Sequence, residues 1–311
     1  MSDSTRKVTI VGAGFVGSTA ALLLAQKGIA DVVLIDVAQG LAGGKALDMR
    51  QMAAIAPCGV TVTGTDDYAD TAGSDIVVIT AGIARKPGML REELVAINEG
   101  IVSDVIERAL GASPDALIMC VTNPLDVMTA LAQKRSGLPT ARVFGMGGLL
   151  DTARFIYSIA AELGVATSDV DALVIGAHGE GMVPLVDEAT VAGRPLRELA
   201  TAEQLASIVQ HTVQGGAEIV ALLKTGSAYF APGAAIARMV EACLTESDDI
   251  ISVCAYLEGA YGLEGLYLNV PVRLGATGVR EVVELAISAE EREALDASAA
   301  GVRALLAEAG V

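Results

Sequence analysis

The stretch that decides the fold is KVTIVGAGFVG, residues 7–17, in which a short apolar run ends in three spaced glycines. The segment Lys7 to Val11 predicts a buried strand, and Ser18 to Lys27 predicts the helix that follows the turn. A G-x-G-x-x-G turn is weak when it stands alone, but between a strand and a helix it is typical of dinucleotide binding. The chain therefore begins with a βα unit suited to a phosphate group.

The turn itself explains why glycine is needed in it. Gly12 permits the tight bend, Gly14 lets the backbone approach a pyrophosphate, and Gly17 lets the helix pack against the strand. The first helical turn also has free N–H groups and the positive end of the helix dipole. We therefore predict that these residues bind the cofactor: Gly12, Ala13, Gly14, Phe15, Val16 and Gly17. The alternative is a glycine-rich turn with a structural role only.

Asp36 ends the next predicted strand, Asp31 to Ile35. A carboxylate there accepts hydrogen bonds from the adenosine ribose and repels a 2′-phosphate, so we expect NAD rather than NADP. The alternative is a surface carboxylate that ends a strand. A P-loop does not fit around Gly44-Lys45, because Gln39 and Ala46 stand where it needs Gly and Ser or Thr.

Beyond Asp36 the first half of the chain alternates between strand and helix patterns, which predicts βαβ units and a parallel sheet. The predicted strands are Val60–Thr63, Ile76–Thr80 and Ala116–Val121, and the predicted helices are Leu94–Leu110 and Leu125–Lys134. After about Phe144 the pattern changes to long helices over Leu149–Leu163, Ala202–Leu223 and Ala289–Ala307, and to strands over Leu173–Ile175, Ile250–Ala255, Leu266–Leu268 and Val270–Leu274. We predict an α/β fold with a doubly wound, Rossmann-type NAD-binding domain over residues 1–145. A mixed α+β domain that binds substrate and carries the catalytic residues follows over residues 146–311.

Composition limits the partners and the location. The 311 residues are 52% hydrophobic with a net charge of −17, which disfavours disorder and disfavours nucleic acid or an anionic membrane as partner. The longest apolar run, Ala20 to Ala25, is too short for a membrane span, and the polar residues 1–7 do not resemble a signal peptide. Four cysteines without a C-x-x-C pair indicate free thiols, and we expect a cytoplasmic protein.

Candidate chemical groups lie in three segments. His178 follows an apolar strand among glycines, where a catalytic and a structural role are equally compatible with the pattern. His211 lies in a helical pattern and is expected to be structural, and the spacing of these two histidines predicts no metal site. Asp151 and Arg154 stand at a predicted helix start, where Asp151 also suits the helix dipole. The segment 80–91 follows a strand end and holds Arg85, Lys86 and Arg91, either as a lid or as a solvated basic loop.

Together these segments resemble the lactate dehydrogenase-like family of NAD-dependent malate dehydrogenases. The matching segments follow one another over most of the chain: GAGFVG (12–17), Asp36, TAGIARKPGMLREEL (80–94), Asn98, VTNPLD (121–126), LDTAR (150–154), GAHGEGMVPL (176–185) and KTGSAYFAPGAA (224–235). The resemblance implies a reversible oxidation of malate to oxaloacetate, a small dicarboxylate substrate, and a homodimer or homotetramer.

The resemblance also implies residue roles. His178 is the proton donor and acceptor, Asp151 orients it, and Arg91 polarises the reacting carbonyl. Arg154 clamps the substrate carboxylate next to the reacting carbon, and Arg85 reads the distal carboxylate. The remaining implied contacts are Asn123 and Ser227 to substrate, and Asn98, Val121, Thr122 and Asn123 to the cofactor.

Two other functions stay open. A lactate dehydrogenase usually has Gln where this chain has Arg85, and a catalytically silent NAD-binding protein is expected to lack one of the residues His178, Asp151, Arg154 and Arg91, all of which are present. Four positions depart from the family pattern: Gly147 for Ala, Ile156 for a basic residue, Ala177 for Gly and Glu180 for Asp.

Overall fold

The computed structural model describes residues 6–84 and 90–311, without the side chain of Arg91. Its first half is a parallel sheet with the strand order β3-β2-β1-β4-β5-β6. The strands are β1 (Lys7–Val11), β2 (Asp31–Ile35), β3 (Val62–Thr65), β4 (Ile76–Ile79), β5 (Leu117–Cys120) and β6 (Val143–Gly145). The chain runs from the centre to one edge, returns to the centre and continues to the other edge. This is the doubly wound order, and it confirms the predicted fold class.

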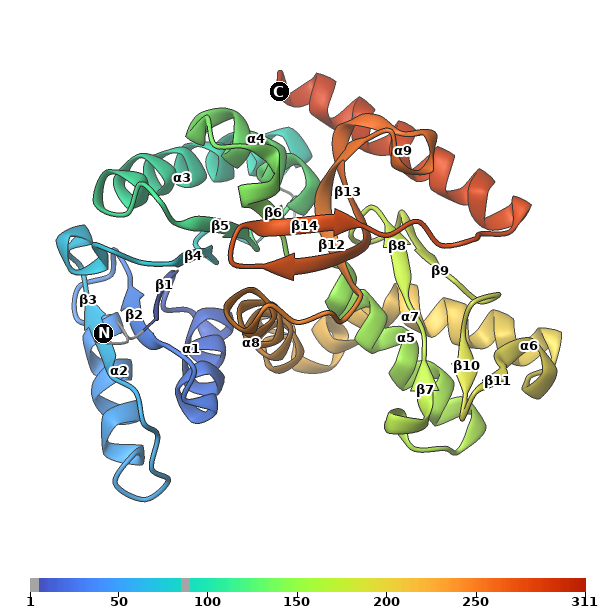
Figure 1. Cartoon of the computed structure of the whole chain (residues 1–311), viewed down its shortest axis with the longest axis horizontal. Helices are drawn as coiled ribbons and strands as arrows, with labels where there is room; N and C mark the ends of the chain where they lie inside the picture. The colour runs from blue at the N-terminus through green and yellow to red at the C-terminus, as the bar shows by residue number, and fades with distance from the viewer. Residues whose placement is uncertain (1–5, 85–89) are drawn as a thin grey trace.

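Helices cover both faces of this sheet. Figure 1 shows α1, α2 and α8 on one face and α3, α4 and α9 on the other. Their bounds are α1 (Phe15–Lys27), α2 (Leu41–Met52), α3 (Arg91–Ala112), α4 (Leu125–Ser136), α8 (Phe230–Thr245) and α9 (Ala289–Ala309). Because both faces are covered, central strands such as β4 (IVVI) and β5 (LIMC) are buried at every position and read as continuous apolar runs.

Beyond β6 the same sheet continues with antiparallel strands. Cys254 of β12 pairs with Gly145 of β6, so the sheet runs unbroken from the first half of the chain into the second. The added strands are β12 (Ile251–Glu258), β13 (Glu264–Gly275), β8 (Val174–Gly176), β9 (Met182–Pro184) and β14 (Gly278–Val282). A separate small sheet contains β7 (Val170–Asp171), β10 (Thr190–Val191) and β11 (Arg194–Pro195), and the helices here are α5 (Gly148–Leu163), α6 (Leu196–Leu199) and α7 (Ala202–Leu223). Four 3₁₀ turns complete the described elements: Tyr68–Thr71, Thr140–Arg142, Thr167–Asp169 and Ala260–Gly262.

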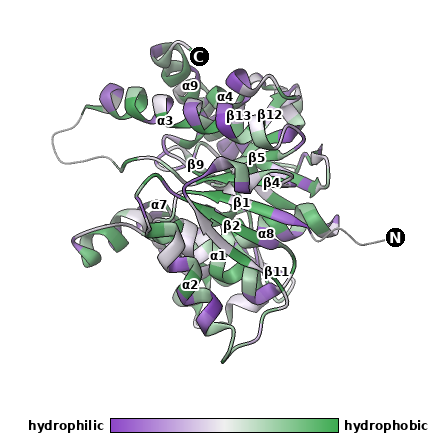
Figure 2. Cartoon of the chain, turned by 90° about the vertical axis from the view of Figure 1, so that its left-hand side faces the viewer, coloured by the Kyte–Doolittle hydropathy of each residue, from purple (hydrophilic) through white to green (hydrophobic). Residues whose placement is uncertain are grey.

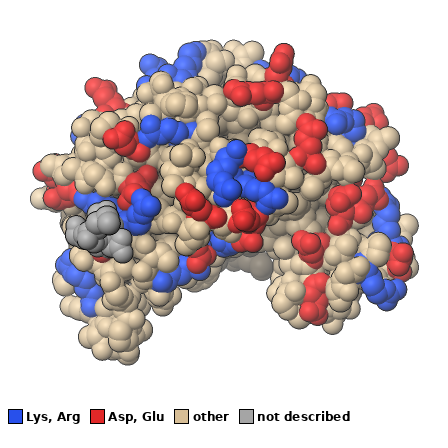
Figure 3. Space-filling model, in the orientation of Figure 1, with Lys and Arg blue, Asp and Glu red and all other residues tan. Residues whose placement is uncertain are grey.

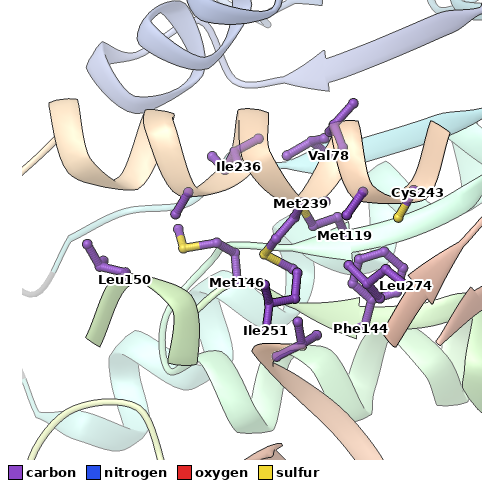
Figure 4. Packing of buried hydrophobic residues seen from close by; sticks show 14 of the residues in the cluster. Val78, Met119, Phe144, Met146, Leu150, Ile236, Met239, Cys243, Ile251 and Leu274 are labelled. Atoms are coloured by element: carbon purple, nitrogen blue, oxygen red, sulfur yellow. The ribbon is translucent and has the colours of Figure 1, made fainter. Parts of the chain in front are cut away.

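Helix α8 packs the two halves into one core. Figure 4 shows Ile236, Met239 and Cys243 on the face of α8 that meets side chains of the sheet. The side chains there come from both halves of the chain: Val78, Met119, Phe144, Ile251 and Leu274 from strands, and Met146 from the bend after β6. Large, buried side chains make this contact costly to open, so it fixes the glycine-rich turn of the first half relative to the segments of the second half that hold the candidate site residues.

The surface differs sharply from this interior. In Figure 2 the strands at the centre of the molecule are hydrophobic, and hydrophilic residues lie mainly on the outer turns and helices. Figure 3 shows Lys and Arg interspersed with Asp and Glu on the face it presents. No helix in the described part of the chain is long and apolar enough to cross a bilayer.

The predicted elements differ from the observed ones at several places. The two strands predicted over Leu266–Leu268 and Val270–Leu274 are one strand, β13, because Asn269 between them is buried and continues the pairing with β12. The strand predicted at Val60 begins at Val62 instead. Helices α2 and α8 were not predicted, since α2 contains Gly43-Gly44 and α8 begins with Pro and Gly in its first turn, where Pro is tolerated.

Candidate functional site

The glycine-rich turn lies where β1 meets α1, and its geometry requires glycine at two positions. Gly12 has φ of +109°, and a Cβ there would lie 2.6 Å from the Thr80 hydroxyl. A Cβ at Gly17 would collide with the Gly12 carbonyl oxygen. At Gly14, by contrast, a Cβ would meet nothing within 4 Å, so this side of the turn is open. The packing at Gly17 and the open side at Gly14 both agree with the predicted roles.

The open side of the turn presents hydrogen-bond donors. In the described chain the backbone N–H groups of Gly14, Phe15, Val16 and Gly17 have no protein acceptor. The Asp36 carboxylate closes the other side, with one oxygen accepting from Ala13 N–H at 2.6 Å and the other from Ala38 N–H at 2.8 Å. Four unpaired donors at a helix N-terminus next to a carboxylate fit a pyrophosphate and the ribose beside it.

A second group of predicted cofactor residues comes together at the ends of β4 and β5. Asn98 is fully buried, and its side chain donates to Ile83 O at 3.1 Å and to Asn123 O at 2.7 Å. The Asn98 side-chain oxygen accepts from Ile83 N–H at 2.8 Å, so this amide already ties the two loops together. Thr122 donates to Ala81 O at 2.6 Å, and Val121 continues the parallel pairing through its N–H to Ile79 O. Asn123 itself is exposed.

His178, Asp151 and Arg154 form a connected polar group at the junction of β8 and α5. His178 Nδ1 lies 2.8 Å from one Asp151 oxygen, and Arg154 Nη1 lies 3.0 Å from the other. Asp151 is 1% exposed, whereas the His178 and Arg154 side chains are 16% and 18% exposed. The buried carboxylate thus holds an imidazole and a guanidinium that both reach solvent.

The surroundings of His178 favour its protonated form. Burial opposes the charged imidazolium, but the Asp151 carboxylate, its hydrogen bond and the charge of Asp126 together raise the pKa of His178 above its ordinary value of 6.5. Arg154 acts in the opposite direction and lowers this pKa. A histidine whose protonated form is stabilised in this way is suited to act as a general acid.

Asp126 is a second carboxylate beside His178 that the sequence analysis did not single out. It is buried in the first turn of α4. Its Oδ2 accepts a hydrogen bond from the backbone N–H of His178 at 3.2 Å, and its Oδ1 accepts one from the Cys254 thiol at 3.5 Å. Burial raises the pKa of Asp126 to about 6, against the lowering effect of His178. The signal in the sequence was an acidic residue inside the apolar helix pattern that begins at Leu125.

Asn269 is the other positioning residue that the sequence analysis missed. Its buried side chain accepts from Gly148 N–H at 2.6 Å and donates to Gly176 O at 2.8 Å. Gly148 begins the helix that carries Asp151, and Gly176 ends the strand that leads to His178. Asn269 therefore fastens together the two segments whose side chains meet, and a lone Asn within the apolar run 266–274 was its signal.

The departures from the family pattern have different surroundings. A Cβ at Gly147 would collide with Leu125 and lie 3.1 Å from His178 Cβ, so glycine here leaves room for the histidine. Ile156 is partly buried against the second-half core. Ala177 donates its N–H to Ser298 at 2.8 Å, and Glu180 lines the cleft described next.

A cleft of about 930 Å³ opens beside His178, between the loop after β8 and helix α9. Among the described residues, its polar lining is Asn123, Asp126, His178, Glu180, Ser298 and Glu308, with no Lys or Arg. Ser227 lies elsewhere, in the exposed loop between α7 and α8. Arg85 and Lys86 lie outside the described residues, and Arg91 begins α3 without a described side chain.

Neither His211 nor any of the four cysteines lines this cleft. His211 is 61% exposed and pairs with Glu218 on the surface of α7. Within residues 6–84 and 90–311, His, Cys, Asp and Glu form no group of three or more that is able to hold a metal ion. All four cysteines have free thiols, and Cys120, Cys243 and Cys254 are buried.

Comparison with protein families matches both halves of the chain. The lactate/malate dehydrogenase NAD-binding domain matches residues 6–145, and the lactate/malate dehydrogenase alpha/beta C-terminal domain matches residues 149–309. The first match contains the glycine-rich turn and Asp36, which confirms the prediction of NAD as the cofactor.

Individual proteins agree with these matches over nearly the whole chain. A malate dehydrogenase from Desulforudis audaxviator is 52% identical over 301 residues, which are 97% of each chain. The crystal structure of malate dehydrogenase from Salinibacter ruber superposes with a TM-score of 0.93 at 46% identity, covering 97% of both chains. The lactate dehydrogenase from Cryptosporidium parvum, complexed with lactic acid and NAD, gives a TM-score of 0.95 at 41% identity over 99% of this chain and 98% of that one. With both family domains matched in order and relatives of this similarity, the chain belongs to the lactate/malate dehydrogenase family.

Proposed function

We propose that this protein is an NAD-dependent malate dehydrogenase that interconverts malate and oxaloacetate. The observation that carries the assignment is the buried Asp151 carboxylate, which holds both His178 and Arg154, with His178 also lining the cleft. The curated relatives at about 50% identity are named malate dehydrogenases, and Arg85 favours a dicarboxylate over lactate. The test is NADH oxidation with oxaloacetate and, separately, with pyruvate; a preference for pyruvate would instead support a lactate dehydrogenase.

The proposed roles follow from what each side chain can do. NADH, when bound, supplies the hydride. His178 donates a proton to the substrate oxygen through Nε2 while Nδ1 stays on Asp151, which fixes the ring and favours the imidazolium. Arg154 has a planar fork that pairs both oxygens of the substrate carboxylate, and Lys is unable to reproduce this geometry. Arg91 stabilises the negative charge that develops on the substrate oxygen.

The other assignments complete the site. We propose Asn123, Arg85 and Ser227 as substrate contacts, and the 12–17 turn, Asp36, Asn98, Val121, Thr122 and Asn123 as the cofactor set. Asn98 acts here through the two loops that its amide joins. The division at residues 145 and 146 is supported by the two family matches, although β6 and β12 pair across it. We further propose a cytoplasmic homodimer or homotetramer, in keeping with the free thiols.

Cofactor choice gives the first prediction. Asp36→Ser removes the carboxylate proposed to face the 2′ position of the adenosine ribose. The preference for NAD over NADP should then fall by about tenfold or more, which is the effect expected from losing one charge–charge contact. Because Asp36 also accepts from Ala13 N–H, affinity for NAD itself should weaken as well. The measurement is kcat/KM with both cofactors, with exposed Asp48→Ser on α2 as the charge-matched control. Equal wild-type turnover with NAD and NADP would contradict the assignment.

The pH profile gives the second prediction. Oxaloacetate reduction needs protonated His178, so its kcat/KM should be level below the raised pKa of His178 and fall as pH rises through that pKa. Malate oxidation needs the neutral ring and should rise over the same range. Since the Asp126 carboxylate raises the pKa of His178, Asp126→Asn should lower that pKa. The fall in oxaloacetate reduction and the rise in malate oxidation should then both occur at lower pH.

The control for this experiment is Asp104→Asn, which removes an exposed carboxylate of α3 and changes the net charge equally. Its pH profile should match that of the wild type. A profile of Asp126→Asn that coincides with the wild type would show that Asp126 does not act on His178.

A further inference from the structure

Lys45 stands beside the glycine-rich turn and makes contacts that no other part of the site explains. It lies in α2, and its ammonium donates to Ala13 O at 2.6 Å and to Ser18 Oγ at 2.7 Å, with Gly14 O at 3.4 Å. It also lies 5.5 Å from the centre of the Phe15 ring. All of these contacts of Lys45 are therefore with residues 13–18, which form the turn and the start of α1.

These contacts set the direction of the donors on the open side of the turn. In a planar trans peptide the C=O and N–H groups point in opposite directions. The Ala13 carbonyl shares its peptide plane with Gly14 N–H, and the Gly14 carbonyl shares its plane with Phe15 N–H. Ser18 contacts the same two carbonyls, with its N–H donating to Gly14 O at 3.0 Å and its hydroxyl reaching both oxygens. Together, Lys45 and Ser18 hold the two carbonyls on one side of the turn, so that the two N–H groups point away from Lys45. They are two of the four N–H groups of this turn that have no acceptor in the described chain.

Lys45 also brings a positive charge to the turn. Burial lowers the pKa of Lys45 while the Asp36 carboxylate raises it, so the ammonium is partly removed from water but has an acidic neighbour. The Asp36 carboxylate accepts a hydrogen bond from the Ala13 N–H at 2.6 Å, and the Lys45 ammonium donates one to the carbonyl oxygen of the same residue. The turn is therefore held from both sides by opposite charges.

We propose that Lys45 is a cofactor-positioning residue, which fixes the glycine-rich turn in its anion-binding shape and adds positive charge for the dinucleotide pyrophosphate. The proposal rests on the proposed function, in which this turn binds NAD. It also gives Gly44-Lys45 a role although the sequence around it does not form a P-loop. The lysine lies in α2 but contacts the glycine-rich turn between β1 and α1.

The test compares an anionic with a neutral fragment of the cofactor. Lys45→Met removes the charge and keeps most of the side-chain stem, and binding is followed by NADH fluorescence, with ADP and adenosine as displacing ligands. NADH and ADP should bind about tenfold more weakly, whereas adenosine should change by less than about twofold, because only the first two carry phosphates. The loss for ADP should shrink as salt is raised.

The matched control is Lys27→Met, at the other end of helix α1, where the lysine pairs with Glu241 at 3.0 Å. It changes the net charge equally and should leave ADP binding as in the wild type. Lys45→Gln keeps an amide donor without the charge; it should lose ADP affinity in the same way and serves if Lys45→Met does not fold.

The possible outcomes separate this inference from the proposed function. If wild-type protein does not bind NADH, the proposed function fails. If wild type binds NADH and the Lys45 variants lose ADP and adenosine affinity equally, or lose neither, the role of Lys45 at the pyrophosphate is wrong while the proposed function stands.

Discussion

A His178→Asn variant is expected to bind NADH like the wild type and to reduce oxaloacetate slower by a factor of about 10²–10⁴. The asparagine amide is able to keep a hydrogen bond toward Asp151, but it does not titrate and has no proton to give. The negative charge that develops on the substrate oxygen then loses its proton donor, and water is a much weaker acid than an imidazolium. The affinity for NADH should hold, because the glycine-rich turn and Asp36 lie in the other half of the chain.

The chain offers a matched control for this experiment. His211 is the second of its two histidines and lies exposed on α7, so His211→Asn makes the same substitution away from the cleft. Its turnover should be close to that of the wild type. Measurements of kcat, NADH fluorescence and thermal unfolding on both variants separate lost chemistry from lost folding. Near-normal turnover by a folded His178→Asn variant would refute the proposed role.

The sequence predicted well those features that are local. A strand, a glycine-rich turn and a helix follow one another within residues 7–27, so spacing alone predicts the βα unit and the place of Asp36 after the next strand. The bounds of β1, β2 and α7 are those expected. The apolar runs of β4 and β5 are readable because both faces of the sheet are covered.

The features that the sequence did not predict depend on contacts between distant segments. Asn269 joins Gly148 to Gly176, and Asp126 meets the backbone of His178, although each pair is far apart along the chain. A single buried polar residue in an apolar pattern predicts that a partner exists but not which one. Lys45 shows the same limit, since its sequence context suggested only a failed P-loop. These contacts form only when distant segments pack together in the folded chain, so the local pattern of apolar residues does not predict them.

Substrate choice should depend on Arg85, which lies outside the described residues. Oxaloacetate carries a second carboxylate that pyruvate lacks. When a site excludes water, a charge without a partner loses its hydration and gains no ion pair in return, so binding it is costly. The described lining of the cleft contains Asp126, Glu180 and Glu308 but no Lys or Arg, and Arg154 is assigned to the carboxylate next to the reacting carbon. The distal carboxylate therefore depends on a cation from the segment 80–91, of which Arg85 is able to pair both carboxylate oxygens.

We therefore expect Arg85→Gln to lower kcat/KM for oxaloacetate by about 30-fold to several thousand-fold, since losing one partner of a buried charge pair costs about 2–5 kcal/mol. Activity on pyruvate should rise relative to oxaloacetate, because wild-type Arg85 is left without its carboxylate when the smaller substrate binds. Lys86, the next residue in the sequence, is able to supply a replacement charge, so the double variant with Lys86→Gln should show the larger change. Arg108→Gln, which removes an exposed arginine of α3, is the control and should leave the ratio unchanged. A ratio of oxaloacetate to pyruvate activity that stays within a few-fold of wild type in the double variant would show that another group reads the distal carboxylate.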